Sequence, residues 1–239
     1  MYMEESVLSQ QALAYIRREK RKLLLDFANP DVHKPSEHPV TLFMAGSPGS
    51  GKTEVSRQLV QSHLFAGNLP VRIDADDIRE MFPEYTGVNS HLFQAACSVG
   101  VSNLYFHCLK KRYNVIMDAT FAYARALENV QLSLDKKRHA ELYYLYQDPM
   151  IAWEFTQKRE ATEGRRVSME VFIDAFLGAH RNTLQTFERF GDRMTVNVLL
   201  RNFSTNSDSF HQHVTKEAFD ALIPNTYSVR ELHTMLKPL

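Results

Sequence analysis

A glycine-rich segment between a short apolar run and a helical pattern constrains this chain more than any other feature. The segment GSPGSGKT at residues 46–53 matches the pattern G-x-x-x-x-G-K-[ST] in full, and the apolar run VTLFMA directly precedes it. A loop of this kind between a strand and a helix wraps phosphate groups, because its glycines allow a tight path and the N–H groups of the helix N-terminus point inward. The pattern predicts a nucleoside triphosphate site formed by Gly46, Ser47, Pro48, Gly49, Ser50, Gly51, Lys52 and Thr53.

Two residues are predicted to hold the metal ion that accompanies such a nucleotide. In this motif the lysine, here Lys52, reaches the outer phosphates, and the hydroxyl of the last residue, Thr53, binds Mg²⁺. An acidic residue at the end of a nearby strand then organises the metal. The run VIMD ends at Asp118, which we expect to act on Mg²⁺ through a bound water. An aspartate that merely ends a buried strand is the alternative.

Strand and helix patterns alternate along the rest of the chain. Further apolar runs of strand length occupy residues 71–74, 113–119, 141–146 and 194–200, and segments with helical spacing separate them. This alternation is typical of an α/β protein with helices on both faces of its sheet. We expect a three-layer sandwich with a mostly parallel, five-stranded sheet, built as a single domain over residues 1–239. An N-terminal helix at about residues 5–28 is expected to pack on it.

The charge balance limits the classes of partner. Lys and Arg together number 28, as do Asp and Glu, so the formal net charge is zero. Such a balance provides no positive field to gather nucleic acid or an anionic membrane, and we expect neither as a partner. The N-terminus is acidic where a signal peptide would be basic, and no apolar run approaches the ~20 residues of a membrane span. With only two cysteines, a reduced, cytoplasmic protein is expected.

The basic run RREKRK at residues 17–22 lies on the polar face of the expected N-terminal helix. The opposite face carries Leu8, Ala12 and Ile16 at helical spacing. The run fits a solvated helix face or a docking surface for a partner, and both interpretations stay open.

Three aspartates crowd the segment RIDADDIREMFPEY at residues 72–85. Alternation along the preceding strand places Asp74 and Asp76 on one side, and the carboxyl end of such a strand faces the ligand crevice. We predict that Asp76 is a general base, which takes the proton of a hydroxyl acceptor as it attacks a phosphoryl group. Asp77 is expected to cap the following helix, and Asp74 to support the loop by accepting backbone hydrogen bonds.

The segment QKREATEGRRVS at residues 157–168 places Arg159, Arg165 and Arg166 around a glycine between two helical patterns. Guanidinium groups that arrive when a lid closes stabilise the charge on a phosphoryl group in transfer. Ordinary exposed arginines at a helix junction are the alternative. No guanine-reading N-K-x-D run occurs, so a small kinase is favoured over a GTPase.

Together these motifs resemble the zeta-toxin kinases, toxins of bacterial toxin–antitoxin systems that phosphorylate UDP-N-acetylglucosamine on its sugar. The resemblance rests on GSPGSGKT, RIDADDIREMFPEY, YNVIMDAT and the lid arginines, and extends to about residue 200. It implies a P-loop kinase-like fold with a helical lid, ATP and Mg²⁺ held by Lys52 and Thr53, Asp76 as the base, and Arg159 and Arg165 in the lid. It also implies a nucleotide-sugar acceptor and a possible antitoxin partner.

Two positions depart from the family pattern. Where the family has a substrate-binding glutamate on a long helix, this chain offers Ser102 or Asn103, and Ala122 stands where an arginine is usual. The implied acceptor contacts are therefore Asp74, Asp76, Ser102, Asn103 and Thr120. Two other functions stay open: a kinase of another nucleotide sugar, a nucleotide or an antibiotic, and a binding module in which the nucleotide only holds a conformation.

Overall fold

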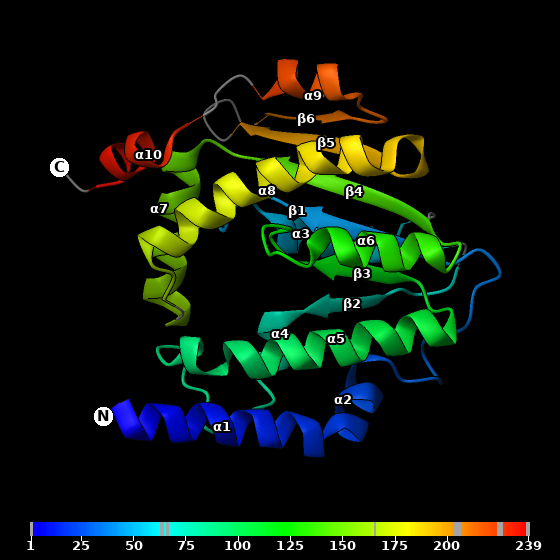
Figure 1. The fold of residues 1–239 in the computed structure, drawn as a ribbon, viewed down its shortest axis with the longest axis vertical. Coiled ribbons are helices and arrows are strands. Elements are labelled where there is room, and N and C mark those ends of the chain that lie inside the picture. The colour runs from blue at the N-terminus through cyan, green and yellow to red at the C-terminus, as the bar shows by residue number, and fades with distance from the viewer. Residues whose placement is uncertain are drawn as a thin grey trace.

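A central sheet with helices on both faces forms the body of the molecule in the computed structural model, which describes residues 2–62, 65, 67–164, 166–202, 207–223 and 227–237 (Figure 1). Within these residues the sheet has six strands in the order β2-β3-β1-β4-β5-β6. The strands are β1 (Val40–Ala45), β2 (Val71–Asp74), β3 (Val115–Asp118), β4 (His139–Tyr146), β5 (Thr195–Asn202) and β6 (Ser207–His211). Strands β1 to β5 pair in parallel, and β6 pairs antiparallel with β5.

The expected α/β sandwich and its mostly parallel sheet are confirmed, but the expected number of five strands is wrong. The sixth strand, β6, lies at the sheet edge, where Asp208, Ser209 and Phe210 are exposed. Its sequence SDSFH therefore has no buried apolar run, and only its pairing with β5 makes it a strand. Phe210 stacks on Tyr143 of β4, with ring centroids 6.1 Å apart.

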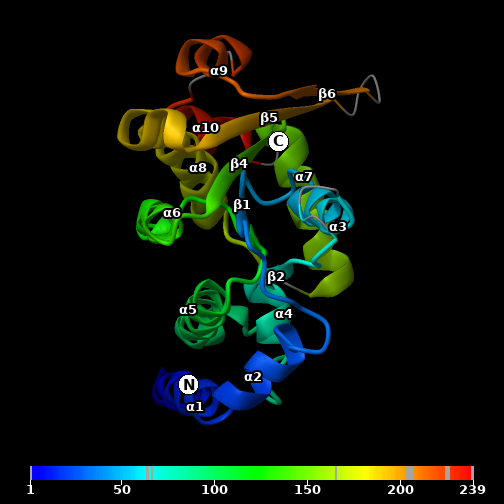
Figure 2. The same ribbon diagram turned by 90° about the vertical axis from the view of Figure 1, so that its right-hand side faces the viewer.

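The helices divide between the two faces of the sheet (Figure 2). On one face lie α5 (Gln94–Lys111), α6 (Ala126–Asp135) and α8 (Met169–Phe190), and on the other lie α3 (Lys52–Val60) and α7 (Pro149–Glu163). The other helices are α1 (Tyr2–Arg18), α2 (Lys20–Phe27), α4 (Ala75–Arg79), α9 (Lys216–Leu222) and α10 (Val229–Met235), with 3-10 turns η2 (Ser90–Phe93) and η3 (Gly191–Arg193). Among the described helices, none combines the length and the apolar character needed to cross a bilayer.

The N-terminal segment forms two helices where one was expected. α1 ends at Arg18 and α2 begins at Lys20, so Glu19 separates them. Both helices pack against α5, and Ile16 and Leu23 are fully buried. The basic side chains of residues 17–22 are exposed, and their role as a docking surface stays a prediction.

Strand β1 is buried along its whole length and fixes the start of the glycine-rich loop. Leu42 and Met44 pack in a cluster with α3, whereas Phe43 packs on the other face against Tyr105 of α5. Successive side chains of a strand point to opposite faces, so a strand covered on both faces is apolar along most of its length. The loop therefore leaves the sheet from a rigid position.

Candidate active site

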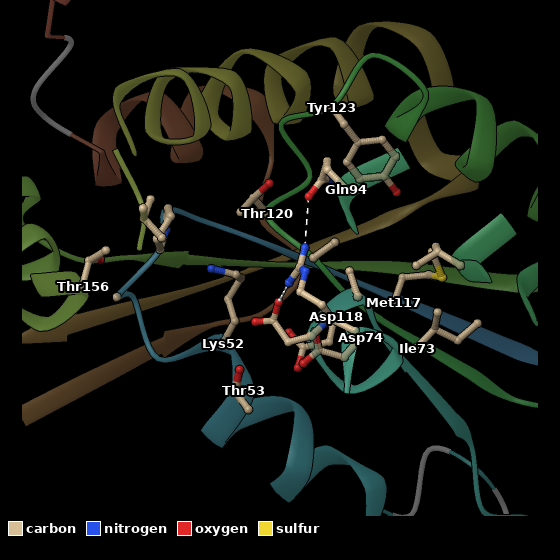
Figure 3. Close-up of a pocket in the computed structure, with 18 of the residues that line it drawn as sticks. Lys52, Thr53, Ile73, Asp74, Gln94, Met117, Asp118, Thr120, Tyr123 and Thr156 are labelled. Carbon is tan, nitrogen blue, oxygen red and sulfur yellow. Dashed lines mark hydrogen bonds and ion pairs between the residues drawn. The ribbon is translucent and has the colours of Figure 1, made fainter. Parts of the chain in front are cut away.

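A cavity of about 830 Å³ opens where β1, β2 and β3 end (Figure 3). Its walls are the glycine-rich loop, the start of α4, one side of α5, the loop after β3, and α7. The carboxyl ends of strands are the usual ligand site of an open α/β sheet. The cavity thus joins motifs that lie far apart in the sequence.

Close contacts with α7 fix the backbone of the glycine-rich loop. Gly49 and Gly51 adopt left-handed conformations, with φ angles of 75° and 85°. A Cβ on Gly49 would overlap the carbonyl oxygen of Ala152 and would lie 2.9 Å from Thr156 Oγ1, both on α7. Glycine is therefore required at position 49 by its conformation and by its close neighbours.

Lys52 and Thr53 begin α3 and line the cavity, as the motif predicts (Figure 3). The Lys52 ammonium donates to the carbonyl oxygen of Ser47 at 2.6 Å, and its Nζ lies 3.4 Å from Ser50 Oγ. These contacts hold the ammonium over the loop. The N-terminus of α3 adds its own positive field at the same point, so this end of the cavity favours an anion.

Asp118 ends β3 in the same cavity and is 6% exposed. Its Oδ2 accepts hydrogen bonds from Ser56 Oγ at 2.5 Å and from Arg72 Nε at 3.0 Å, while Oδ1 has no hydrogen bond among the described residues. That oxygen and the Thr53 hydroxyl are hard donors of the type that Mg²⁺ prefers. No cluster of three or more His, Cys, Asp or Glu side chains in the described part of the chain could hold a metal by itself. The residues fit a Mg²⁺ whose remaining ligands are nucleotide phosphates and water.

The three aspartates at the end of β2 and the start of α4 lie differently from the sequence-based expectation. The strand ends at Asp74 and α4 begins at Ala75, so Asp76 belongs to the first helical turn and not to the strand. Asp74 is the N-cap, because its side chain accepts the backbone N–H of Asp76 at 2.9 Å. Its expected support of the backbone is confirmed. The expectation that Asp77 is the cap is wrong, because α4 starts earlier and Asp77 instead pairs with Arg72 at 2.5 Å.

Arg72 is shared by three carboxylates. Its guanidinium lies 2.5 Å from Asp74 and from Asp77 and 2.9 Å from Asp118. Burial alone would lower the pKa of Arg72, but these carboxylates raise it above its usual value. Burial, followed by the charges of Asp118 and Asp76, raises the pKa of Asp74 to about 7. The single shared guanidinium offsets only part of that rise.

Asp76 lines the cavity and is held by a buried arginine. Arg79, 3% exposed, forms an ion pair with Asp76 through Nη1 and donates from Nη2 to Gln94 Oε1 at 3.0 Å. Gln94 begins α5 and also lines the cavity (Figure 3). The carboxylate expected to be the base is thereby linked to the wall formed by α5.

The part of α5 that faces the cavity carries neutral side chains. Ser102 lines the cavity together with Gln94 and Ser98, whereas Asn103 is not among the described lining residues. Of the two candidates for the family glutamate, only Ser102 therefore reaches the cavity. No acidic side chain replaces that glutamate on the described face of α5.

The loop after β3 adds Thr120 and Tyr123 to the cavity (Figure 3). Thr120 accepts the Gly46 N–H through its carbonyl oxygen at 3.2 Å, which joins this loop to the glycine-rich loop. The Tyr123 hydroxyl accepts a hydrogen bond from Asn129 Nδ2 at 3.1 Å. Burial raises the pKa of Tyr123, so its phenol stays protonated near neutral pH.

Ala122 is turned toward α8 and is not one of the described lining residues. A Cβ on Gly178 of α8 would lie 2.9 Å from the Ala122 Cβ and 3.1 Å from its carbonyl oxygen. The loop and α8 therefore pack tightly here. A longer side chain at position 122, where the family pattern has an arginine, would have to turn away from α8.

The lid segment is formed by the end of α7 and the start of α8. Gly164 ends α7 with a φ of 70°, which permits the sharp turn between the helices. Arg159 lines the cavity, while Arg166 is exposed and has its Nε 3.9 Å from Glu160. Arg165 lies outside the described residues, and its role stays a prediction.

The cavity residues outside the recognisable motifs include Arg79, Gln94, Tyr123 and Arg201. Of these four, Arg79 has a local signal, because it lies three residues after Asp76, the spacing at which helical side chains meet. The other three depend on contacts between distant segments.

Comparisons with known proteins agree with this fold. Residues 8–227 match the family described as Zeta toxin. The fold is similar to a structure from the PezAT chromosomal toxin–antitoxin system of Streptococcus pneumoniae, with a TM-score of 0.62, 20% identity, and coverage of 96% of this chain and 91% of that one. It is also similar to AvrRxo1-ORF1:-ORF2 with ATP, with a TM-score of 0.61, 15% identity, and coverage of 93% and 73%. A search of curated proteins gave no match. Because the family match spans most of the sequence, this chain belongs to the zeta toxin family and has its P-loop kinase fold.

Proposed function

We propose that this protein is an ATP-dependent kinase that transfers the γ-phosphoryl group of ATP to a sugar hydroxyl of UDP-N-acetylglucosamine. The observation that carries the proposal is that one cavity contains both a complete phosphate loop and the Asp76 carboxylate. A protein that only binds a nucleotide needs no base beside its phosphates. Zeta-toxin family membership supports the same reaction.

The donor side binds ATP through residues 46–53, with the loop N–H groups and Lys52 on its phosphates. Thr53 and Asp118 would hold Mg²⁺, which supplies charge neutralisation for the phosphates when it is bound. Asp118 would act through its Oδ1, since Oδ2 is occupied by Ser56 and Arg72.

In the transfer step, the acceptor hydroxyl oxygen forms a bond to the γ-phosphorus while the bond to the ADP oxygen breaks. The hydroxyl proton moves to Asp76, which is the general base. Arg79 holds the Asp76 carboxylate in place from inside the protein. The ADP oxygen leaves with the electron pair of the broken bond.

Arg159 and Arg165 stabilise the charge on the phosphoryl group in transfer. Such charge is greatest in the transition state, so guanidinium groups aimed at it increase kcat more than they increase ATP affinity. Arg159 already lines the cavity.

The acceptor would contact Asp74, Asp76, Ser102 and Thr120, all of which line the cavity. Asn103 is the weaker choice because it does not line it. Phosphorylated UDP-N-acetylglucosamine has lost a free sugar hydroxyl, so the kinase would block the synthesis of cell-wall precursors. An antitoxin partner and a cytoplasmic site of action belong to the same proposal. The resemblance to structures from the PezAT system and from AvrRxo1-ORF1:-ORF2 supports the former.

A second candidate function is a kinase of another small acceptor, such as another nucleotide sugar, a nucleotide or an antibiotic. The observation that favours it is the acceptor wall itself, where neutral Ser102 replaces a glutamate and Ala122 faces α8.

An acceptor screen by mass spectrometry tests both candidates. Purified protein with Mg·ATP is expected to add one phosphoryl group to UDP-N-acetylglucosamine. A phosphorylated product from a different compound would select the second candidate. No acceptor-dependent ATP turnover with any compound, in protein that binds ATP, would instead favour a nucleotide-gated binding module.

A further inference from the structure

Arg201, near the end of β5, lies against the phosphate loop although it belongs to no phosphate-binding motif. A Cβ on Gly51 would overlap Arg201 Nη1 and would lie 3.0 Å from its Cζ. The side chain lines the same cavity as Lys52 and is 18% exposed. The guanidinium therefore occupies the space beside the loop residue that immediately precedes Lys52.

The β5–β6 hairpin places this side chain. Arg201 is paired in register with Asp208 of β6, and its Nε lies 3.5 Å from Asp208 Oδ2. The Asp208 side chain is 45% exposed, so it contacts Arg201 from the solvent side. The edge strand thus positions a cation at the loop.

The charges around Gly51 explain why an anion belongs there. The N-terminus of α3 and the Lys52 ammonium already make this end of the cavity positive. The guanidinium of Arg201 is a third positive group at the same place and is repelled by the other two. A polyphosphate removes that repulsion, and a planar guanidinium can bind two of its oxygens.

We propose that Arg201 binds the phosphate chain of ATP beside Gly51. The proposal rests on the proposed kinase function, since it concerns the same nucleotide. The contact lies on a sheet strand rather than on the lid, so it is made equally before transfer, during transfer and with ADP. Arg201 therefore contributes to nucleotide affinity and leaves kcat at saturating ATP unchanged, in contrast to the lid arginines.

Calorimetric titration with Mg·ADP and with adenosine tests the contact, because neither ligand requires an acceptor. Arg201→Gln is expected to weaken ADP binding by about 10- to 100-fold, the range for a hydrogen bond to a charged group. Adenosine, which has no phosphate, is expected to bind Arg201→Gln and the wild type equally. Arg193→Gln removes the same charge from an exposed position outside the described cavity lining and serves as the matched control.

Three results would overturn the contact. One is an ADP affinity of Arg201→Gln equal to that of the control, and another is an equal loss for adenosine, which would move the contact to the nucleoside. The third is a loss confined to kcat. If Arg201→Gln does not fold, Arg201→Lys carries the test with an expected loss of about 3- to 10-fold, since lysine lacks the planar fork. A wild type that binds no Mg·ADP would contradict the kinase function itself, whereas normal wild-type binding with unaffected variants would contradict only the role of Arg201.

Discussion

The two halves of the cavity are built on different principles. The donor half is made by eight consecutive residues, and its ligand groups are largely backbone N–H groups at a helix N-terminus. The acceptor half is assembled from α4, α5 and the loop after β3, and its groups are side chains. A site made of backbone groups depends on the path of one short segment, so its motif is kept or lost as a unit. A site made of side chains can change one residue at a time. This difference explains why the donor half matches its motif in full while Ser102 and Ala122 depart from the family pattern.

The largest effect is expected from Lys52→Ala, which removes a side chain of the donor half. It should reduce phosphoryl transfer by on the order of 10³-fold or more, because a cation that meets transition-state charge is lost. Folding should be retained, since the loop backbone is held by α7. Steady-state kinetics and thermal unfolding of the same preparation measure both effects.

Expression in bacteria provides the matching test in cells. The wild type is expected to inhibit growth, and Lys52→Ala is expected to be harmless. Equal inhibition by both proteins would show that kinase activity is not the toxic agent.

Asp76→Asn should abolish most acceptor-dependent transfer and leave nucleotide binding by the donor half unchanged. Loss of the general base predicts a decrease of about 10²- to 10⁴-fold in acceptor-dependent transfer, with unchanged ADP affinity. Asp77→Asn is the control, because Asp77 pairs with Arg72 and its side chain is 36% exposed. A larger loss at Asp77 than at Asp76 would reverse the assignment of the base.

The lid arginines connect the halves during transfer. Arg159→Ala and Arg165→Ala are each expected to lower kcat by roughly 10²- to 10³-fold, with a smaller change in ATP affinity. Arg166→Ala, which removes an exposed side chain, should have little effect. An effect of Arg159→Ala on the ATP KM alone would place this residue in ground-state binding.

Tyr123→Phe should affect the acceptor half only. Loss of the hydroxyl, which accepts a hydrogen bond from Asn129, is expected to raise the acceptor KM by about 3- to 10-fold, the value of one neutral hydrogen bond. The KM for ATP should stay constant. Tyr15→Phe, on α1 and outside the described cavity lining, is the matched control, and a shift in the ATP KM of Tyr123→Phe would contradict the division.

A separate effect concerns the pH dependence of stability. Burial raises the pKa of Asp74 to about 7, so its protonated form is favoured in the folded protein. Protonation of Asp74 therefore stabilises the folded protein. This stabilisation is complete below the unfolded pKa near 4 and is lost as pH rises through about 7. Asp74→Asn keeps the helix cap but cannot ionise, so its free energy of unfolding relative to wild type should increase between pH 5 and pH 8, by at most about 3 kcal/mol.

Urea unfolding at the two pH values measures the difference. Asp77→Asn, on the same guanidinium but more exposed, is the control. A wild type and an Asp74→Asn protein with the same pH dependence would show that Asp74 is ionised in the fold.

The sequence predicts the donor half because the residues that form it are contiguous. The loop, Lys52 and Thr53 follow from one contiguous motif, and the buried run of β1 fixes where that motif begins. The position at which β2 ends is not determined by local sequence. It is set by the pairing of Asp74 with Asp118 of β3, and any of the three aspartates could have served as the cap.

The remaining differences have the same origin. β6 has no buried apolar run, and Arg201 reaches the loop only through the pairing of β5 with β6. Arg79 and Gln94 meet because α4 packs on α5. The roles of Asp76, Arg159 and Arg165 stay predictions until they are measured.

The contact between Ala122 and Gly178 has a consequence for how this chain can evolve. An arginine at position 122 would begin at a Cβ that faces the backbone of α8, and forcing a larger side chain into a packed contact typically costs about 1–3 kcal/mol. An arginine at this position therefore needs either a side chain that turns away from α8 or a shift of α8. We therefore expect a single substitution at position 122 to alter acceptor choice less readily than substitutions on α5 or at Tyr123. Directed-evolution libraries that vary those positions should change specificity more readily than libraries that vary position 122.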